Sequence, residues 1–254
     1  MGPYQLIRQL TPGVLAERWL AVHERTQRTH VLHRFTVASD RAASRRFIHM
    51  LRRAESLKHA HVLPIEAVSL DHRGVPFAIT PYTGDQDGLM SLDRLLHIHD
   101  GFLSMEEARR ALRQLLSAVE FAHREGVFHG VLGQREVLVD RSGCLLIELY
   151  GLARGLLAPD AQPSASERLE VRSVFEIGYQ LLTGLRADDP HIPPTRVLPE
   201  LSEDWDSLFD IGLHTGFASA AHALSAVDLC ASGRSGRGLW RMRSALRTLL
   251  SPSR

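Results

Sequence analysis

The chain has 254 residues, of which 44% are hydrophobic, which is enough apolar material for one large domain or two fused lobes. Its formal net charge of +1 is too small to indicate that the whole molecule binds nucleic acid or a membrane surface. Two cysteines supply neither a disulfide framework nor a metal-ligand spacing, and no apolar run reaches membrane-spanning length. We therefore expect a soluble, cytoplasmic protein.

The first part of the chain predicts a small lobe of three strands, one helix and two further strands. The strand segments alternate apolar and polar residues or carry runs of strand formers, and the helix segment places its apolar residues on one face. In chain order these segments are residues 4–10, 18–24, 29–37, 42–59, 64–70 and 75–82. A polar, glycine-bearing connector follows them, so we place the end of this lobe at residue 83.

The second part predicts a mainly helical lobe. Ser104 and Glu107 form a capping box that opens a long amphipathic helix. Two short strands follow on either side of the turn "RSG", and a further helix over residues 169–184 ends at a glycine. Residues 204–227 complete a helical pair.

These elements in this order resemble the protein kinase fold, over roughly residues 4–228. The likeness depends on separated phrases in the right order, among them "LKHAHVLPI", "HGVLGQREVLV", "LYG" and "LLTG". The sequence is similar to bacterial serine/threonine kinases, which implies an α+β, two-lobed fold. That fold would comprise a β-rich N-lobe with one helix over 1–83, a larger, mainly helical C-lobe over 84–228, and a basic C-terminal helix or tail over 229–254.

The resemblance also assigns the positions that bind the phosphates of ATP in kinases. The phosphate-binding lysine corresponds to His33, and the glutamate that pairs with it corresponds to Met50. An imidazole is mostly neutral at pH 7, so it is a poor substitute for a fixed cation. Only Gly13 persists from the glycine-rich loop, in "TPGVLA".

The adenine side of the pocket is less altered. Thr80 aligns with the residue that guards the adenine pocket, and the backbone of Pro81 and Thr83 could still bind a purine. These residues, with Gly13, form at most a vestigial nucleotide pocket. Metal-independent ATP binding stays open on this reading, but we expect no cofactor and no metal.

The catalytic motifs are replaced as well. In "HGVLGQRE" the catalytic aspartate corresponds to Val131, the nearby lysine to Gly133 and the metal-binding asparagine to Glu136. In "LYG" Leu149 stands where kinases hold a metal with aspartate, and we expect Glu148 to face away from the site. Both Leu149 and Met50 are expected to fill apolar space where kinases keep charge.

Two further features concern the loop and the segment after it. His129 matches the structural histidine of the family and is expected to bond to the backbone. The segment between Leu149 and Glu170 is too short for a normal activation segment, and "APD" at 158–160 is a relic of its end. Ser164 and Ser166 fall in what reads as a Pro/Ser/Ala linker.

These replacements predict a catalytically inactive kinase-like protein that is not an enzyme and that acts on a protein partner as a scaffold or allosteric regulator. We expect no membrane partner and no nucleic acid. One alternative is a divergent serine/threonine kinase that binds ATP and uses arginine and Glu136 in place of the usual residues. Another is an anionic or nucleic-acid partner held by the tail, whose residues 232–254 carry six arginines. Lys58 is the single lysine of the chain.

Overall fold

The computed structural model describes residues 2–35, 41–98, 101–152, 163–188 and 190–231. The chain divides into two compact units. The first unit comprises Met1–Arg94, Glu125–His129 and Gln134–Ala161, and the second comprises Leu95–Arg124, Gly130–Gly133 and Gln162–Arg254. The sequence-based boundary at residue 83 stays a prediction.

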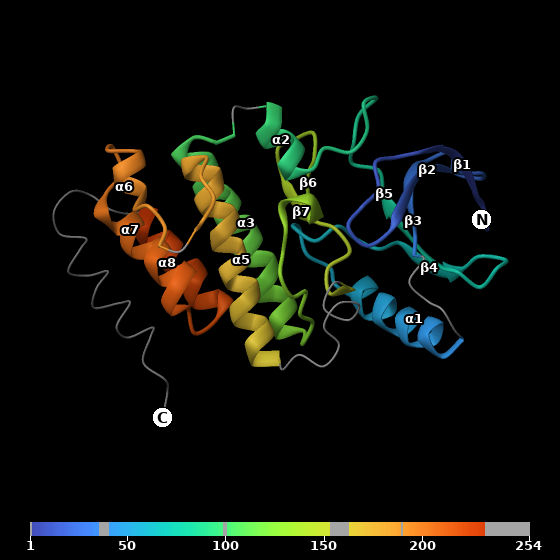
Figure 1. Cartoon of the computed structure of the whole chain (residues 1–254). Coiled ribbons are helices and arrows are strands. Elements are labelled where there is room, and N and C mark those ends of the chain that lie inside the picture. Colours follow the sequence, from blue (N-terminus) through green and yellow to red (C-terminus); the bar gives the residue numbers. More distant parts are fainter. Residues whose placement is uncertain (1, 36–40, 99–100, 153–162, 189, 232–254) are drawn as a thin grey trace. The chain divides into compact units, whose positions relative to one another are not determined.

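The first unit is built on a five-stranded antiparallel sheet in the order β1-β2-β3-β5-β4 (Figure 1). A helix, α1, follows β3 in the sequence and packs against β4 and β5. The bounds are β1 Tyr4–Gln9, β2 Glu17–His23, β3 Thr29–Arg34, α1 Arg41–Glu55, β4 Ala67–Leu70 and β5 Pro76–Pro81.

Both faces of the central strands β3 and β5 are buried, which fits the mainly apolar sequence of β5. In β3 the buried positions also include two histidines, His30 and His33. On one face Leu32, Phe77 and Ile79 pack with Ala21 of β2. A second apolar cluster joins α1 to the sheet and contains these buried residues: Ala16, Phe35, Phe47, Leu51, Ala54, Ile65, Ala78, Leu149 and Leu152.

A two-stranded sheet, β6 (Val137–Val139) with β7 (Leu145–Ile147), belongs to the same unit. Its β7 strand is hydrogen-bonded to the segment after α1, because the Ile147 N–H donates to the His61 carbonyl and the Leu63 N–H donates to the Ile147 carbonyl, at 3.0 and 2.9 Å. Lys58, just before this segment, is exposed.

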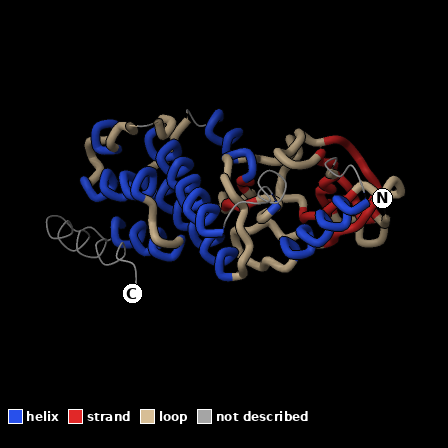
Figure 2. Tube along the Cα trace, turned by 60° about the horizontal axis from the view of Figure 1, so that its bottom comes forward, coloured by secondary structure: helices blue, strands red, loops and turns tan. Residues whose placement is uncertain are grey.

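The second unit is helical (Figure 2). Its helices α3, α5 and α8 pack against one another. Gly178 of α5 lies so close to α3 that a Cβ there would be 2.3 Å from Leu112 Cδ2. Helix α2 (Leu92–Ile98) begins in the first unit and ends in the second. The other bounds are α3 Met105–Arg124, α5 Pro163–Thr183, α6 Pro194–Val197, α7 Glu203–Asp210, a π-helical turn Ile211–Thr215 and α8 Ala220–Ala231.

The structure confirms most elements predicted from the sequence, including the capping box, in which the Ser104 N–H donates to the Glu107 carboxylate at 3.0 Å. Helix α5 is different, because it begins at Pro163 rather than near residue 169. Ser164 and Ser166 therefore belong to its first turns and not to a linker. Proline is favoured at the first helical position, where its missing N–H is not needed.

Residues 158–160 and 232–254 lie outside the described residues, so the predictions for the "APD" relic and for the basic tail stay predictions. No helix in the described part of the chain combines the length and the apolar character needed to span a bilayer.

The two cysteines are expected to react at very different rates with a thiol reagent. Burial, aided by the charge of Asp204, raises the pKa of the Cys230 thiol to about 12, so almost no thiolate is available at mildly alkaline pH. Cys144 is partly exposed. With Ellman's reagent the native protein should release one rapid equivalent, and the second should appear only after unfolding in guanidinium chloride. Each single-cysteine variant, Cys144→Ser or Cys230→Ser, keeps one thiol, and equal reaction rates for the two native variants would contradict this.

Candidate functional site

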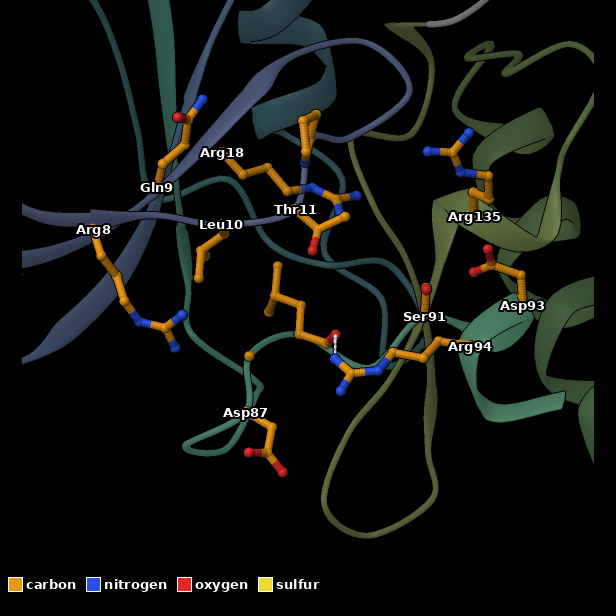
Figure 3. A pocket seen from close by; sticks show the side chains of 13 residues that line it. Arg8, Gln9, Leu10, Thr11, Arg18, Asp87, Ser91, Asp93, Arg94 and Arg135 are labelled. Atoms are coloured by element: carbon orange, nitrogen blue, oxygen red, sulfur yellow. Dashed lines mark hydrogen bonds between the residues drawn. The ribbon is translucent and has the colours of Figure 1, made fainter. Parts of the chain in front are cut away.

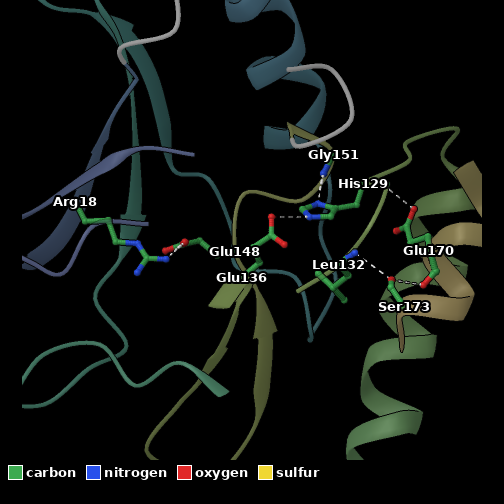
Figure 4. Close-up of polar contacts among 9 residues, drawn as sticks. Arg18, His129, Leu132, Glu136, Glu148, Gly151, Glu170 and Ser173 are labelled. Atoms are coloured by element: carbon green, nitrogen blue, oxygen red, sulfur yellow. Dashed lines mark hydrogen bonds and ion pairs between the residues drawn. The ribbon is translucent and has the colours of Figure 1, made fainter. Parts of the chain in front are cut away.

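The stretch at residues 129–139 forms a loop, a single 3-10 turn over Gln134–Glu136, and strand β6. His129 is fully buried at its start and bonds on both sides of its ring (Figure 4). Its Nδ1 accepts the Gly151 backbone N–H at 3.1 Å, and its Nε2 lies 3.2 Å from Glu136 Oε1. Because Nδ1 accepts, the proton belongs on Nε2, which donates to the carboxylate. This confirms the expected backbone bond of His129.

In the second unit, residues 130–133 are anchored on α5 (Figure 4). The Gly130 N–H donates to the Glu170 carboxylate at 3.3 Å, and the Leu132 N–H donates to Ser173 Oγ at 3.0 Å. Ser173 Oγ in turn donates to the Glu170 carbonyl at 2.8 Å. Both side chains are buried, so the backbone of this loop is held in one conformation.

His33 lies on β3 in the first unit and is completely buried. Its Nε2 is 2.9 Å from Thr80 Oγ1 on the neighbouring strand, and its Nδ1 is 3.9 Å from Glu148 Oε1. Burial lowers the pKa of His33 to about 3, and the positive charge of Arg18 acts in the same direction. The imidazole is therefore neutral at pH 7.

Glu148 does not face away from this region. Its carboxylate forms a buried ion pair with Arg18 of β2, across 130 positions of sequence (Figure 4). Burial raises the pKa of Glu148, and the Arg18 guanidinium opposes that rise. Gly13 leaves space for this arginine, because a Cβ at Gly13 would be 2.8 Å from Arg18 Nε.

The other positions singled out from the sequence are scattered. Leu149 is buried in the apolar cluster beneath α1, and Met50 packs against that cluster, as expected. Leu149 has a φ of 50°, which is rare for a residue with a side chain. Val131 is 62% exposed. Gly133, Pro81 and Thr83 are partly exposed.

A cavity of about 290 Å³ lies in the first unit, against β1, the loop that follows it and the start of α2 (Figure 3). Four arginines line it: Arg8, Arg18, Arg94 and Arg135. In Figure 3 the guanidinium groups of Arg18 and Arg135 point toward each other from opposite sides. Sequence reasoning missed this set, although the near absence of lysine meant that arginine had to supply any cationic site.

Within the described ranges, no group of three or more His, Cys, Asp or Glu side chains could hold a metal ion. The cationic side chains among the residues that line the cavity are its four arginines.

The chain has a protein kinase fold and belongs to the protein tyrosine and serine/threonine kinase family, whose model matches residues 5–174. A crystal structure of the Mycobacterium tuberculosis PknI kinase domain superposes with a TM-score of 0.71, at 19% identity, covering 90% of this chain and 96% of that one. The two-lobed, α+β fold expected from the sequence is thereby confirmed.

Curated relatives match at modest identity. A probable serine/threonine-protein kinase, pknA2 of Bifidobacterium longum, is 24% identical over 233 residues, 82% of this chain and 30% of the relative. CBL-interacting protein kinase 12 of Oryza sativa is 28% identical over 61% of this chain and 28% of its own length. Serine/threonine-protein kinase PrkC of Bacillus subtilis is 27% identical over 61% and 23%. The chain thus spans less than a third of the length of these relatives.

These comparisons contradict the expectation of an inactive scaffold that is not an enzyme. The family is one of kinases, and the relatives are named as serine/threonine-protein kinases, so the findings favour the divergent kinase. Losses at motif positions leave out the cations that other positions supply. Arg94 and Arg135, which line the cavity, lie outside the positions that were compared.

Proposed function

We propose that this protein is a divergent serine/threonine protein kinase, located in the cytosol, that binds ATP and transfers its γ-phosphoryl group to a hydroxyl of a protein. The observation that carries the proposal is that each part of the loop at residues 129–136 is hydrogen-bonded within its own unit. His129 fixes the loop to Gly151 in the first unit, and Glu170 and Ser173 fix residues 130–132 in the second.

Fixed geometry matters because phosphoryl transfer asks little covalent chemistry of the protein. Catalysis of this reaction comes almost entirely from positioning and from electrostatic stabilisation of the transferred group. Arginine can supply such stabilisation, and a single well-placed arginine accelerates some phosphoryl transfers by about 10³–10⁵-fold. Among the described residues we assign this task to the arginines of the cavity and the Glu136 carboxylate, all in the first unit.

The direct test is transfer of radiolabelled γ-phosphate from ATP to a generic protein acceptor and to the protein itself, with magnesium, with manganese and with chelator. We expect incorporation on serine or threonine above that of a heat-inactivated sample. Incorporation equal to the inactivated sample under all three conditions would refute the proposal.

Loosening the loop is expected to slow transfer without weakening ATP binding. Ser173→Ala removes the oxygen that accepts the Leu132 N–H, so we expect a rate about tenfold lower, since that bond holds the loop in position. Ser225→Ala is the matched control, because its Oγ also donates to a backbone carbonyl, that of Ala221, but on the exposed side of α8. Equal transfer rates for both variants would show that this anchor does not matter for the reaction.

A further inference from the structure

Two histidines of the second unit lie side by side where the π-helical turn packs against α5. His191 Nδ1 is 2.8 Å from His214 Nε2. The two rings are stacked, with centroids 5.0 Å apart and planes at 28°. His191 is partly exposed and His214 is exposed, so solvent reaches the pair. Neither histidine belongs to the loop at residues 129–136 or lines the arginine cavity.

The fold holds each of the two rings in place. Tyr179 of α5 is fully buried, and its hydroxyl donates to the Ile192 carbonyl at 2.7 Å, next to His191 in the sequence. The Tyr179 ring also meets the His191 ring edge to face, with centroids 5.5 Å apart. His214 lies in the π-helical turn Ile211–Thr215, a rare conformation that is frequent at functional sites.

The distance between the two ring nitrogens fits two chemical states. A proton on one of the nitrogens gives a hydrogen bond between the rings. Alternatively, one metal ion can bind both nitrogens. Bonds of about 2.0–2.1 Å at an angle near 90° place two such nitrogens about 2.9 Å apart. The pair therefore already has the spacing of two adjacent ligands, and each neutral ring can keep its proton on its other nitrogen.

The chemistry of imidazole selects the class of metal. Neutral imidazole suits zinc, nickel and copper, whereas magnesium and calcium prefer oxygen ligands. No third His, Cys, Asp or Glu side chain joins the pair in the part of the chain that the structure describes, so water completes the coordination.

The helix that carries His214 adds to the attraction for a cation. The π-helical turn directly follows α7, and His214 lies in its last turn. The carbonyl groups at a helix C-terminus bear partial negative charge, which favours a positive ion nearby.

We propose that His191 and His214 form a site for a divalent transition-metal ion of the zinc, nickel and copper class. The ion links the segment after α5 to the π-helical turn, and water fills its remaining positions. This site does not rest on the proposed kinase function, because magnesium, the usual metal of phosphoryl transfer, is not its ligand.

The test is titration calorimetry of the full chain, stripped with chelator and dialysed, with zinc, nickel and magnesium chloride. Cys144→Ser serves as the parent, because Cys144 Sγ lies 3.4 Å from His61 Nδ1 in the first unit and could bind the same ions. We expect one equivalent of zinc or of nickel to bind, and magnesium not to bind. A parent that binds neither zinc nor nickel, or that binds magnesium as tightly, would overturn the proposal.

Variants made in this parent localise the site. His191→Gln and His214→Gln should each weaken zinc and nickel binding by about tenfold or more, because the second metal–nitrogen bond forms within one molecule and is lost in either variant. His97→Gln is the control, because His97 is an exposed histidine of α2 in the same unit. Circular dichroism verifies that each variant is folded. Unchanged affinity in both site variants, or an equal loss in the control, would refute the assignment.

The pH dependence identifies the ligands as imidazoles. A protonated imidazole cannot bind a metal, so the affinity for zinc and nickel should fall markedly between pH 7.5 and pH 5.5 in the parent. Equal affinity at the two pH values would show that oxygen ligands hold the ion and that the histidine pair does not.

Discussion

Replacing Arg18 by leucine is expected to lower the free energy of unfolding by about 3–5 kcal/mol, because it leaves the buried Glu148 carboxylate without an opposite charge. Glu148 would keep its buried carboxylate and lose the cation that pairs with it. Its Oε1 already has no hydrogen-bond partner among the described residues. Denaturation by guanidinium chloride at neutral pH measures the loss.

The control is the double variant Arg18→Leu with Glu148→Leu. Replacing both members of a buried ion pair by apolar residues is often neutral or stabilising, so we expect most of the lost stability to return. A single variant within about 1 kcal/mol of the parent would show that the pair is hydrated in solution, since exposed pairs contribute only that much.

A second large effect is expected on acidification. The folded-state pKa of His33 is about 3, whereas an unfolded histidine has a pKa of about 6.5, so the unfolded chain binds a proton first as the pH falls. The stability that neutral His33 contributes is thus complete above pH 6.5 and is lost by about 1.4 kcal/mol per pH unit below it. Glu148 acts in the opposite sense, because its raised pKa lets the folded protein take up a proton before the unfolded chain does.

Comparison of variants isolates the histidine. The free energy of unfolding of His33→Gln should depend less steeply on pH between about 6.5 and 4 than that of the parent. His72→Gln, in an exposed turn of the same unit, should keep the slope of the parent. Equal slopes for the parent and His33→Gln would mean that the pKa of His33 is not lowered by folding.

The elements of the fold were predictable because their signals are local. The polar turn before β3 and the apolar face of α1 lie within single segments, and the structure confirms the strand and the helix that they predict. The start of α5 was missed because the segment before it is rich in proline, serine and alanine, a composition shared by linkers and first helical turns. Only packing against α3, where Gly178 meets Leu112, shows that this helix is a central element of its unit.

The candidate site was predictable only in part. The neutral state of His33 follows from its residue type and from burial on a central strand. The partnership of Arg18 with Glu148 joins residues 130 positions apart, and no periodicity links them. The cavity arginines come from β1, β2, α2 and the 3-10 turn before β6, so their convergence exists only in the folded chain.

The exposure of Lys58, just after α1, has a consequence for covalent labelling. Because it is the single lysine, an amine-selective reagent finds one side chain to acylate, besides the α-amino group. A fluorophore or cross-linker on the Lys58 side chain would then be attached at one known position, next to the segment that is hydrogen-bonded to β7. Most proteins need engineered cysteines for such uniform attachment, and this chain provides it through its preference for arginine.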